Sequence, residues 1–195
     1  MAVKEVKLST IEEALTTLTT AEFNDALKRN RSAFLFRGLP NVSYKLTTSL
    51  RWNCKGKAGE LEPSILRNFS KYAASTSPLN SCWEQMVIGQ HHGLPTRLMD
   101  WTYSPLAALH FATSREDITG MNQHDAVVWA IDITEMNTLL PAKYQKVLND
   151  ERAYLFTIDM LDRVAKDLTT YDNDMGEDGI VLLEPPSIDQ RIINQ

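Results

Sequence analysis

Charged, polar and aromatic side chains crowd the segment Gly89–Leu109, which reads GQHHGLPTRLMDWTYSPLAAL. Such groups are costly to bury unless they bond to one another or line a ligand site. Asp100 is therefore a candidate catalytic carboxylate. The candidate ligand-binding residues of the same segment are His91, His92, Thr96, Arg97, Trp101 and Thr102.

A helix is expected to begin at Pro105, with Ser104 as its N-cap. Free backbone N–H groups and the helix dipole favour an anionic ligand group near such a helix start. The alternative is structural. Arg97 and Asp100 would then hold the loop in shape, and Trp101 would belong to the core.

Arg37 stands in an otherwise apolar stretch, Ala33–Leu39, that is typical of a buried strand. A guanidinium in that place needs a carboxylate, a phosphate or an opening into a cleft. Gly38 would let a ligand or another backbone approach closely. Arg37 is thus a candidate catalytic and ligand-binding residue, and Gly38 a candidate ligand-binding residue. A structural ion pair, for example with Asp100, is the alternative.

Glu84 and His91 fall seven positions apart, on one face of an expected helix, where they could form an acid–base pair. Glu84 could instead cap that helix. His91 and His92 point about 100° apart on a helix and cannot easily share a metal. With Cys54 and Cys82 at unsuitable spacings, we expect no metal site. The chain also lacks phosphate-loop, serine-hydrolase and zinc-protease motifs.

The composition sets limits on function. The chain has 195 residues, a net charge of −5 and a pI of about 5.4. This acidic balance argues against a broad basic face for nucleic acid, although a local basic patch remains open. A chain with two cysteines is typical of proteins whose thiols stay reduced. Without a secretory signal or a long apolar run, we expect a cytoplasmic protein that does not bind membranes.

Capping residues and hydrophobic periodicity predict the elements, which together give an α+β protein. In the first thirty residues, capping-box patterns at Ser9–Glu12 and Thr19–Glu22 predict two short helices. The other expected elements are a strand at Ala33–Leu39, a mostly irregular Asn41–Gly59, helices at Pro63–Ala74, from Ser81 to Gly93, from Pro105 and at Asp150–Leu168, and strands at Ala126–Ile133 and Ile180–Leu183.

Three sequence features carry a family resemblance. Phe36-Arg37-Gly38 resembles the tripeptide that names the FRG domain family. The segment Gln90–Ala112 resembles the family pattern QHxGLPTRLLDWTxxPLxALxFA, with Met99 in place of a leucine. Arg191–Gln195 resembles a late RIxxQ element. The resemblance implies an FRG domain over 33–195, preceded by a helical segment at 1–32.

The family layout is similar to that of ADP-ribosyltransferases, which implies a split mixed or antiparallel β core with helices and NAD as substrate. The resemblance implies that Arg37 binds the pyrophosphate, assisted by Arg97 or His92. It implies that Trp101 stacks on a ring of NAD and that Asp100 stabilises charge on the ribose. Gln195 would fall near the position of the superfamily's catalytic glutamate, so Asp100 or Glu84 would supply the negative charge.

FRG proteins are associated with bacterial and phage conflict. The resemblance therefore implies a toxin, a phage-defence effector or a counter-defence protein. Its partners would be a macromolecular acceptor, either protein or nucleic acid, and an antitoxin or chaperone. A non-enzymatic nucleotide- or partner-binding module of the same fold is the alternative. A third alternative is that Arg37, Arg97 and Asp100 form a purely structural network.

Overall fold

The computed structural model describes residues 3–20, 23–24, 29–30, 33–73, 81–114, 124–176 and 179–184. The chain divides into two compact units, each assembled from two separate stretches of sequence. The first unit comprises Met1–Lys45 and Asp100–Asp132, and the second comprises Leu46–Met99 and Ile133–Gln195. Helices and antiparallel strands are both present, so the chain is α+β as predicted.

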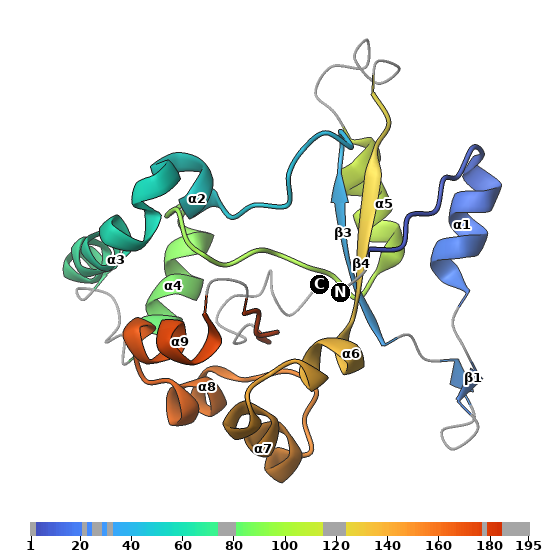
Figure 1. Ribbon diagram of the computed structural model, residues 1–195. Helices are drawn as coiled ribbons and strands as arrows, with labels where there is room; N and C mark the ends of the chain where they lie inside the picture. Colours follow the sequence, from blue (N-terminus) through green and yellow to red (C-terminus); the bar gives the residue numbers. More distant parts are fainter. Residues whose placement is uncertain are drawn as a thin grey trace. The chain divides into compact units, whose positions relative to one another are not determined.

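An antiparallel pair of strands forms the centre of the first unit (Figure 1). Strand β3 spans Phe34–Leu39 and β4 spans Val127–Asp132, so both predicted strands are confirmed. On the edge of β3 that β4 leaves free, the backbone groups of Phe36 and Thr102 exchange two N–H···O bonds of 2.8 and 2.9 Å. The segment before α5 therefore runs alongside β3.

Helix α5, Pro105–Thr113, begins as predicted. The Ser104 hydroxyl accepts a hydrogen bond of 3.2 Å from the Ala107 N–H, and Pro105 occupies the first turn. The helix packs against β3 (Figure 1). A Cβ atom at Gly38 would lie 1.8 Å from the Ala108 carbonyl oxygen, so only glycine allows this approach.

The N-terminal part of the first unit differs from prediction. Helix α1 spans Ile11–Thr19, and its capping box joins Thr10 to Glu13, one residue later than expected. The second predicted helix is wrong. Strand β1 at Phe23–Asn24 pairs antiparallel with β2 at Arg29–Asn30, so these residues bond across two strands rather than within a helix.

The second unit opens with helices where the sequence predicted a mostly irregular 41–59. The Thr48 hydroxyl caps the first of them by accepting from a backbone N–H group. The third helix begins before Pro63, which therefore lies inside it rather than at its first turn. These elements are α2 (Ser49–Cys54), the 3₁₀ helix η1 (Lys55–Lys57) and α3 (Ala58–Ala73).

Helix α4, Cys82–His91, has the predicted N-cap at Ser81. By contrast, the predicted continuous helix over 150–168 is wrong. Phe156 interrupts it, because its backbone N–H and carbonyl bond to Leu182 and Glu184 at 2.9 and 2.8 Å. The predicted strand at 180–183 is reduced to this bridge among the described residues. The helices are α6 (Ile133–Thr138), α7 (Ala142–Glu151), α8 (Ile158–Val164) and α9 (Leu168–Met175).

Large apolar side chains from α4, α7 and α8 form the core of the second unit. Trp83 is 2% exposed, and its indole N–H donates to the Ala165 carbonyl at 2.7 Å. Tyr144 and Phe156 pack edge to face in the same cluster. These buried rings fix the helices that carry the polar residues described below.

Among the described residues, none of the helices combines the length and the apolar character needed to cross a membrane.

Candidate functional site

Arg37 lies on β3, where one of its guanidinium nitrogens has a firm partner. Nη1 donates to the Asp100 carbonyl oxygen at 2.6 Å. The Nε atom is buried and has no hydrogen-bond partner among the described residues. Burial lowers the pKa of Arg37, and the negative charge of Asp100 opposes that effect. The guanidinium is therefore a partly desolvated cation with unused hydrogen-bonding capacity.

Trp129 on β4 stands directly opposite Arg37 in the strand register. Its indole Nε1 is also buried and has no partner within the described part of the chain. Sequence reasoning missed this residue and treated it as part of a buried strand. The pairing of the strands was the missing information, because it places the two residues directly opposite each other.

Arg37 and Trp129 share one face of the strand pair. Gly38 faces α5, and neighbouring residues on a strand point to opposite faces. Arg37 and Trp129 therefore lie on the face away from α5, together with Leu35 and Ile131. In such apolar surroundings, the Arg37 Nε and the Trp129 indole N–H, which have no partner among the described residues, favour an acceptor that carries negative charge.

The Asp-Trp-Thr segment lies beside this pair within the first unit. Thr102 bonds to the β3 backbone, and its hydroxyl accepts from the Ser104 N–H at 3.0 Å. Asp100 is exposed, and Trp101 is half-buried. The structure thus brings Arg37, Asp100, Trp101 and Thr102 together. Gly38 was expected to allow the close approach of a ligand or of another backbone. The structure shows the second of these, because the backbone of α5 approaches Gly38.

Thr96 belongs to the second unit and is almost completely buried. Its hydroxyl donates to the Gln90 side chain, and its N–H donates to the Ser49 hydroxyl at 3.1 Å. Its carbonyl accepts from the Leu50 N–H at 3.0 Å. These bonds tie the loop after α4 to the start of α2, which is a shaping role.

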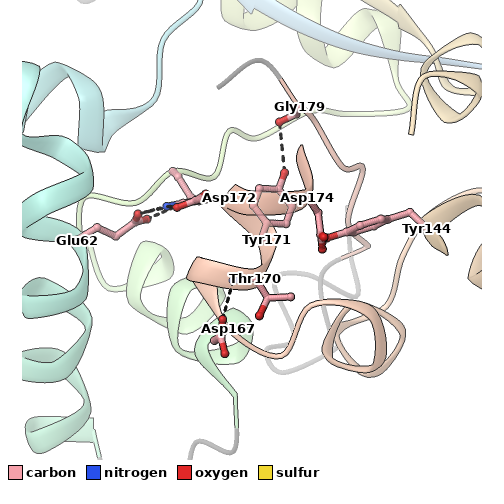
Figure 2. A network of polar contacts seen from close by, with 9 residues as sticks. Glu62, Tyr144, Asp167, Thr170, Tyr171, Asp172, Asp174 and Gly179 are labelled. Carbon is pink, nitrogen blue, oxygen red and sulfur yellow. Dashed lines mark hydrogen bonds and ion pairs between the residues drawn. The ribbon is translucent and has the colours of Figure 1, made fainter. Parts of the chain in front are cut away.

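Arg97 joins two carboxylates from distant parts of the sequence, Glu62 and Asp172, which Figure 2 labels. Its Nε donates to both oxygens of Glu62, at 2.8 and 2.9 Å, and its Nη1 donates to Asp172 at 2.5 Å. Burial opposes its charge, but the bonds to Glu62 and Asp172 outweigh that effect and raise the pKa of Arg97. The contacts thus match the structural alternative for this residue.

Further polar contacts surround the Arg97 network (Figure 2). The guanidinium lies 5.8 Å from the centre of the Tyr171 ring, and the Tyr171 hydroxyl donates to the Gly179 carbonyl at 3.3 Å. The Tyr144 hydroxyl donates to Asp174 at 3.0 Å. The network therefore connects α3, α7 and α9 within the second unit.

The end of α4 carries the two histidines. The Leu94 N–H donates to the Gly89 carbonyl at 2.8 Å, and the Gly93 N–H to the Gln90 carbonyl at 2.9 Å. With Gly93 at a φ of +83°, this is a Schellman motif, so the predicted C-terminal glycine is confirmed. His91 and His92 are exposed, and their rings meet edge to face at 5.8 Å.

Glu84 lies in the first turn of α4, where its N–H donates to the Ser81 hydroxyl at 3.1 Å. It belongs to the second unit, whereas Arg37 and Asp100 belong to the first. Gln195 lies outside the described residues. No group of three His, Cys, Asp or Glu side chains in the described part of the chain could hold a metal ion.

The first unit is thus an α+β assembly in which a strand arginine lies beside an Asp-Trp-Thr segment and a helix capped by Ser-Pro. Residues 32–119 match the model of the FRG domain family, so the chain contains an FRG domain. The match includes β3 and α5 and ends before β4. Searches of curated proteins and of solved structures returned no significant match.

Proposed function

We propose that this FRG domain binds NAD at Arg37 and transfers its ADP-ribose group to a macromolecule. The observation that carries the proposal is the buried Nε of Arg37, which has no hydrogen-bond partner among the described residues. Buried polar groups in proteins are almost always paired, so an orphaned one calls for an explanation. A phosphate oxygen of NAD would supply the missing acceptor and neutralise the cation.

The residues near Arg37 suit the rest of such a substrate. Trp101 is half-buried and offers a ring on which the adenine or nicotinamide can stack. The exposed carboxylate of Asp100 would stabilise positive charge on the ribose. Thr102 holds this segment on β3 through two backbone bonds, which would keep the groups in a fixed arrangement.

In the proposed reaction, the bond between nicotinamide and C1′ of the ribose breaks, and nicotinamide leaves with the bonding electrons. A nucleophilic atom of the acceptor forms the new bond to C1′ and releases its proton. The protein's part is to position the two reactants and to stabilise the cation-like sugar.

We extend the proposal to an ADP-ribosyltransferase-like β core within a domain over 33–195, and to a toxin or phage-defence role.

The direct test is the release of nicotinamide when the purified chain is incubated with NAD and a bacterial cell extract. We expect release above the background of the extract alone, and loss of release in Arg37→Lys. A lysine keeps the charge but cannot present the planar donor fork that binds phosphate. Absence of release from the wild-type chain would overturn the enzymatic proposal.

Arg37→Met separates a ligand-binding role from a structural one. Removing a desolvated cation whose Nε has no partner should leave the melting temperature within a few degrees, because apolar replacements of buried charges are often neutral. If Arg37 instead holds the fold, Arg37→Met should unfold the chain, at a cost of about 3–5 kcal/mol. Circular dichroism, measured beside nicotinamide release, distinguishes these outcomes.

A binding module without catalysis is the second candidate. The contact between Arg37 and Asp100 uses the backbone carbonyl of Asp100, and a backbone carbonyl cannot act as a catalytic base. This candidate predicts that NAD raises the melting temperature by mass action and releases no nicotinamide. The same Arg37→Met variant should abolish that stabilisation.

A further inference from the structure

The structure assigns a second binding site, at the junction of α2 and η1, to single-stranded nucleic acid. We call it the Trp52 patch; it consists of Arg51, Trp52, Lys55 and Lys57. All four side chains are exposed. They lie within seven residues of sequence and belong to the second unit, whereas the residues of the proposed NAD site belong to the first.

Trp52 is the first reason for this assignment. It is 74% exposed, whereas Trp83 of the same unit is 2% exposed and hydrogen-bonded in the core. An exposed tryptophan ring is a platform on which any base can stack, whatever its sequence. Leu50, the neighbouring apolar residue of α2, is buried, so Trp52 does not belong to a wider apolar face of that helix.

The charges around Trp52 are the second reason. No acidic residue occurs between Asp25 and Glu60 in the sequence, although the whole chain carries a net charge of −5. Among the described residues, none of the patch cations forms an ion pair. Their charges therefore remain available for phosphates. Binding would release the counterions of the nucleic acid, and this release would supply the binding free energy.

The backbone at Lys55 is the third reason. Lys55 has φ +51° and ψ −132°, a conformation that glycine adopts readily and that other residues adopt rarely. Glycine would therefore be the less strained choice on backbone grounds. A lysine at this point suggests that its charge serves a function, because strained residues gather at binding sites.

Membranes are the competing target for a cationic patch with a tryptophan. Binding in a membrane interface needs a continuous apolar face along a helix. Helix α2 has six residues, and its apolar Leu50 is turned inward. The combination of one exposed ring and three cations suits alternating bases and phosphates better.

The test uses the full chain and a fluorescein-labelled oligothymidine of about 15 nucleotides, followed by fluorescence anisotropy without NAD. We expect Kd to rise about 20-fold between about 50 and about 200 mM salt, as three phosphate contacts predict. Trp52→Ala should raise Kd about tenfold. The matched controls Tyr72→Ala, an aromatic residue that is 81% exposed on α3, and Lys166→Glu should leave Kd unchanged.

Lys55→Gly guards against a variant that merely fails to fold. It should raise the melting temperature, since glycine tolerates the backbone conformation, and it should weaken oligothymidine binding about fivefold. Weaker binding in a more stable chain would be a direct loss of a contact. Unchanged binding in Lys55→Gly and Trp52→Ala would overturn the proposal.

Two further arms identify the target. A duplex of the same length should bind more weakly than the single strand, because its bases are already stacked. Vesicles containing phosphatidylserine should not bind in a manner that depends on Trp52. Binding to vesicles and not to oligothymidine would overturn the assignment to nucleic acid. Because no arm contains NAD, each result is independent of the proposed transferase activity.

Discussion

Arg37 and Trp129 oppose one another across the β3–β4 pair, and each carries a buried N–H group without a partner in the described residues. Stability does not explain two such groups on one strand face, because each costs desolvation free energy that no described partner offsets. Their joint presence is what points to an anionic ligand at this place in the first unit.

Trp129→Phe should therefore remove a buried N–H group that has no partner among the described residues, and with it a hydrogen bond to the ligand. We expect the free energy of unfolding in urea to change by less than about 1 kcal/mol, because the lost donor was unpaired. The rise in melting temperature that NAD causes should shrink. Trp83→Phe is the matched control. It loses a satisfied bond to Ala165 and should cost about 2 kcal/mol. Equal costs for the two variants would contradict an unpaired Trp129.

Gly38→Ala tests the packing of α5 on β3. The added methyl group would meet backbone atoms of Ala108 and Ala112 at 1.8 and 2.7 Å, so the helix must move. We expect a loss of about 3 kcal/mol in urea unfolding, at the upper end of overpacking costs. Gly59→Ala is the control, because nothing lies within 4 Å of its added Cβ. It should stabilise α3 by up to about 1 kcal/mol.

Glu62→Gln tests whether the Arg97 network is structural. Glu62 is 2% exposed, and the substitution leaves the half-buried Arg97 without its main countercharge. We expect the free energy of unfolding to fall by about 3 kcal/mol. Asp150→Asn breaks the exposed pair with Lys146 and should cost less than about 0.5 kcal/mol. A small effect of Glu62→Gln would leave Arg97 free to act on a ligand.

Cys82 should react slowly with thiol reagents in the folded chain. Burial, followed by the charge of Asp162, raises the pKa of Cys82 from 9.0 to about 11. At a pH of about 8 the thiolate fraction should be about 100-fold lower than in the unfolded chain. Iodoacetamide alkylation of a Cys54→Ala chain, followed against pH, should show a midpoint near 11. A midpoint near 9 would contradict this environment.

The raised pKa of Cys82 also predicts how the stability of the folded chain changes with pH. The folded chain keeps the Cys82 proton to a higher pH than the unfolded chain does. Its contribution to stability is therefore complete below about pH 9 and is lost as the pH rises towards 11. Urea unfolding across that range should show a decline that Cys82→Ala reduces.

Local signals predicted the parts of the fold that local contacts determine. Ser81, Gly93 and Ser104 each satisfy backbone groups within a few residues, so the ends of α4 and the start of α5 were predictable. The interruption at Phe156 was not. It depends on bonds to Leu182 and Glu184, whose positions only the folded chain supplies.

The candidate site divides in the same way. The motif predicted that Asp100 and Thr102 would lie near Arg37, and they do. No local pattern linked Arg97 to Glu62 and Asp172, which are 35 and 75 positions away. The partners of Arg97 therefore had to come from the structure, as did the position of Trp129 opposite Arg37.

The division of the chain also bears on how the FRG domain can be handled. The family match ends at residue 119, but β3 bonds along one edge to β4, which begins at Val127. An excised 32–119 fragment would lose that neighbour and present an open row of amides and carbonyls to other molecules. Such edges promote self-association. Shortened versions of this chain should therefore aggregate, and activity lost on trimming would say nothing about catalysis.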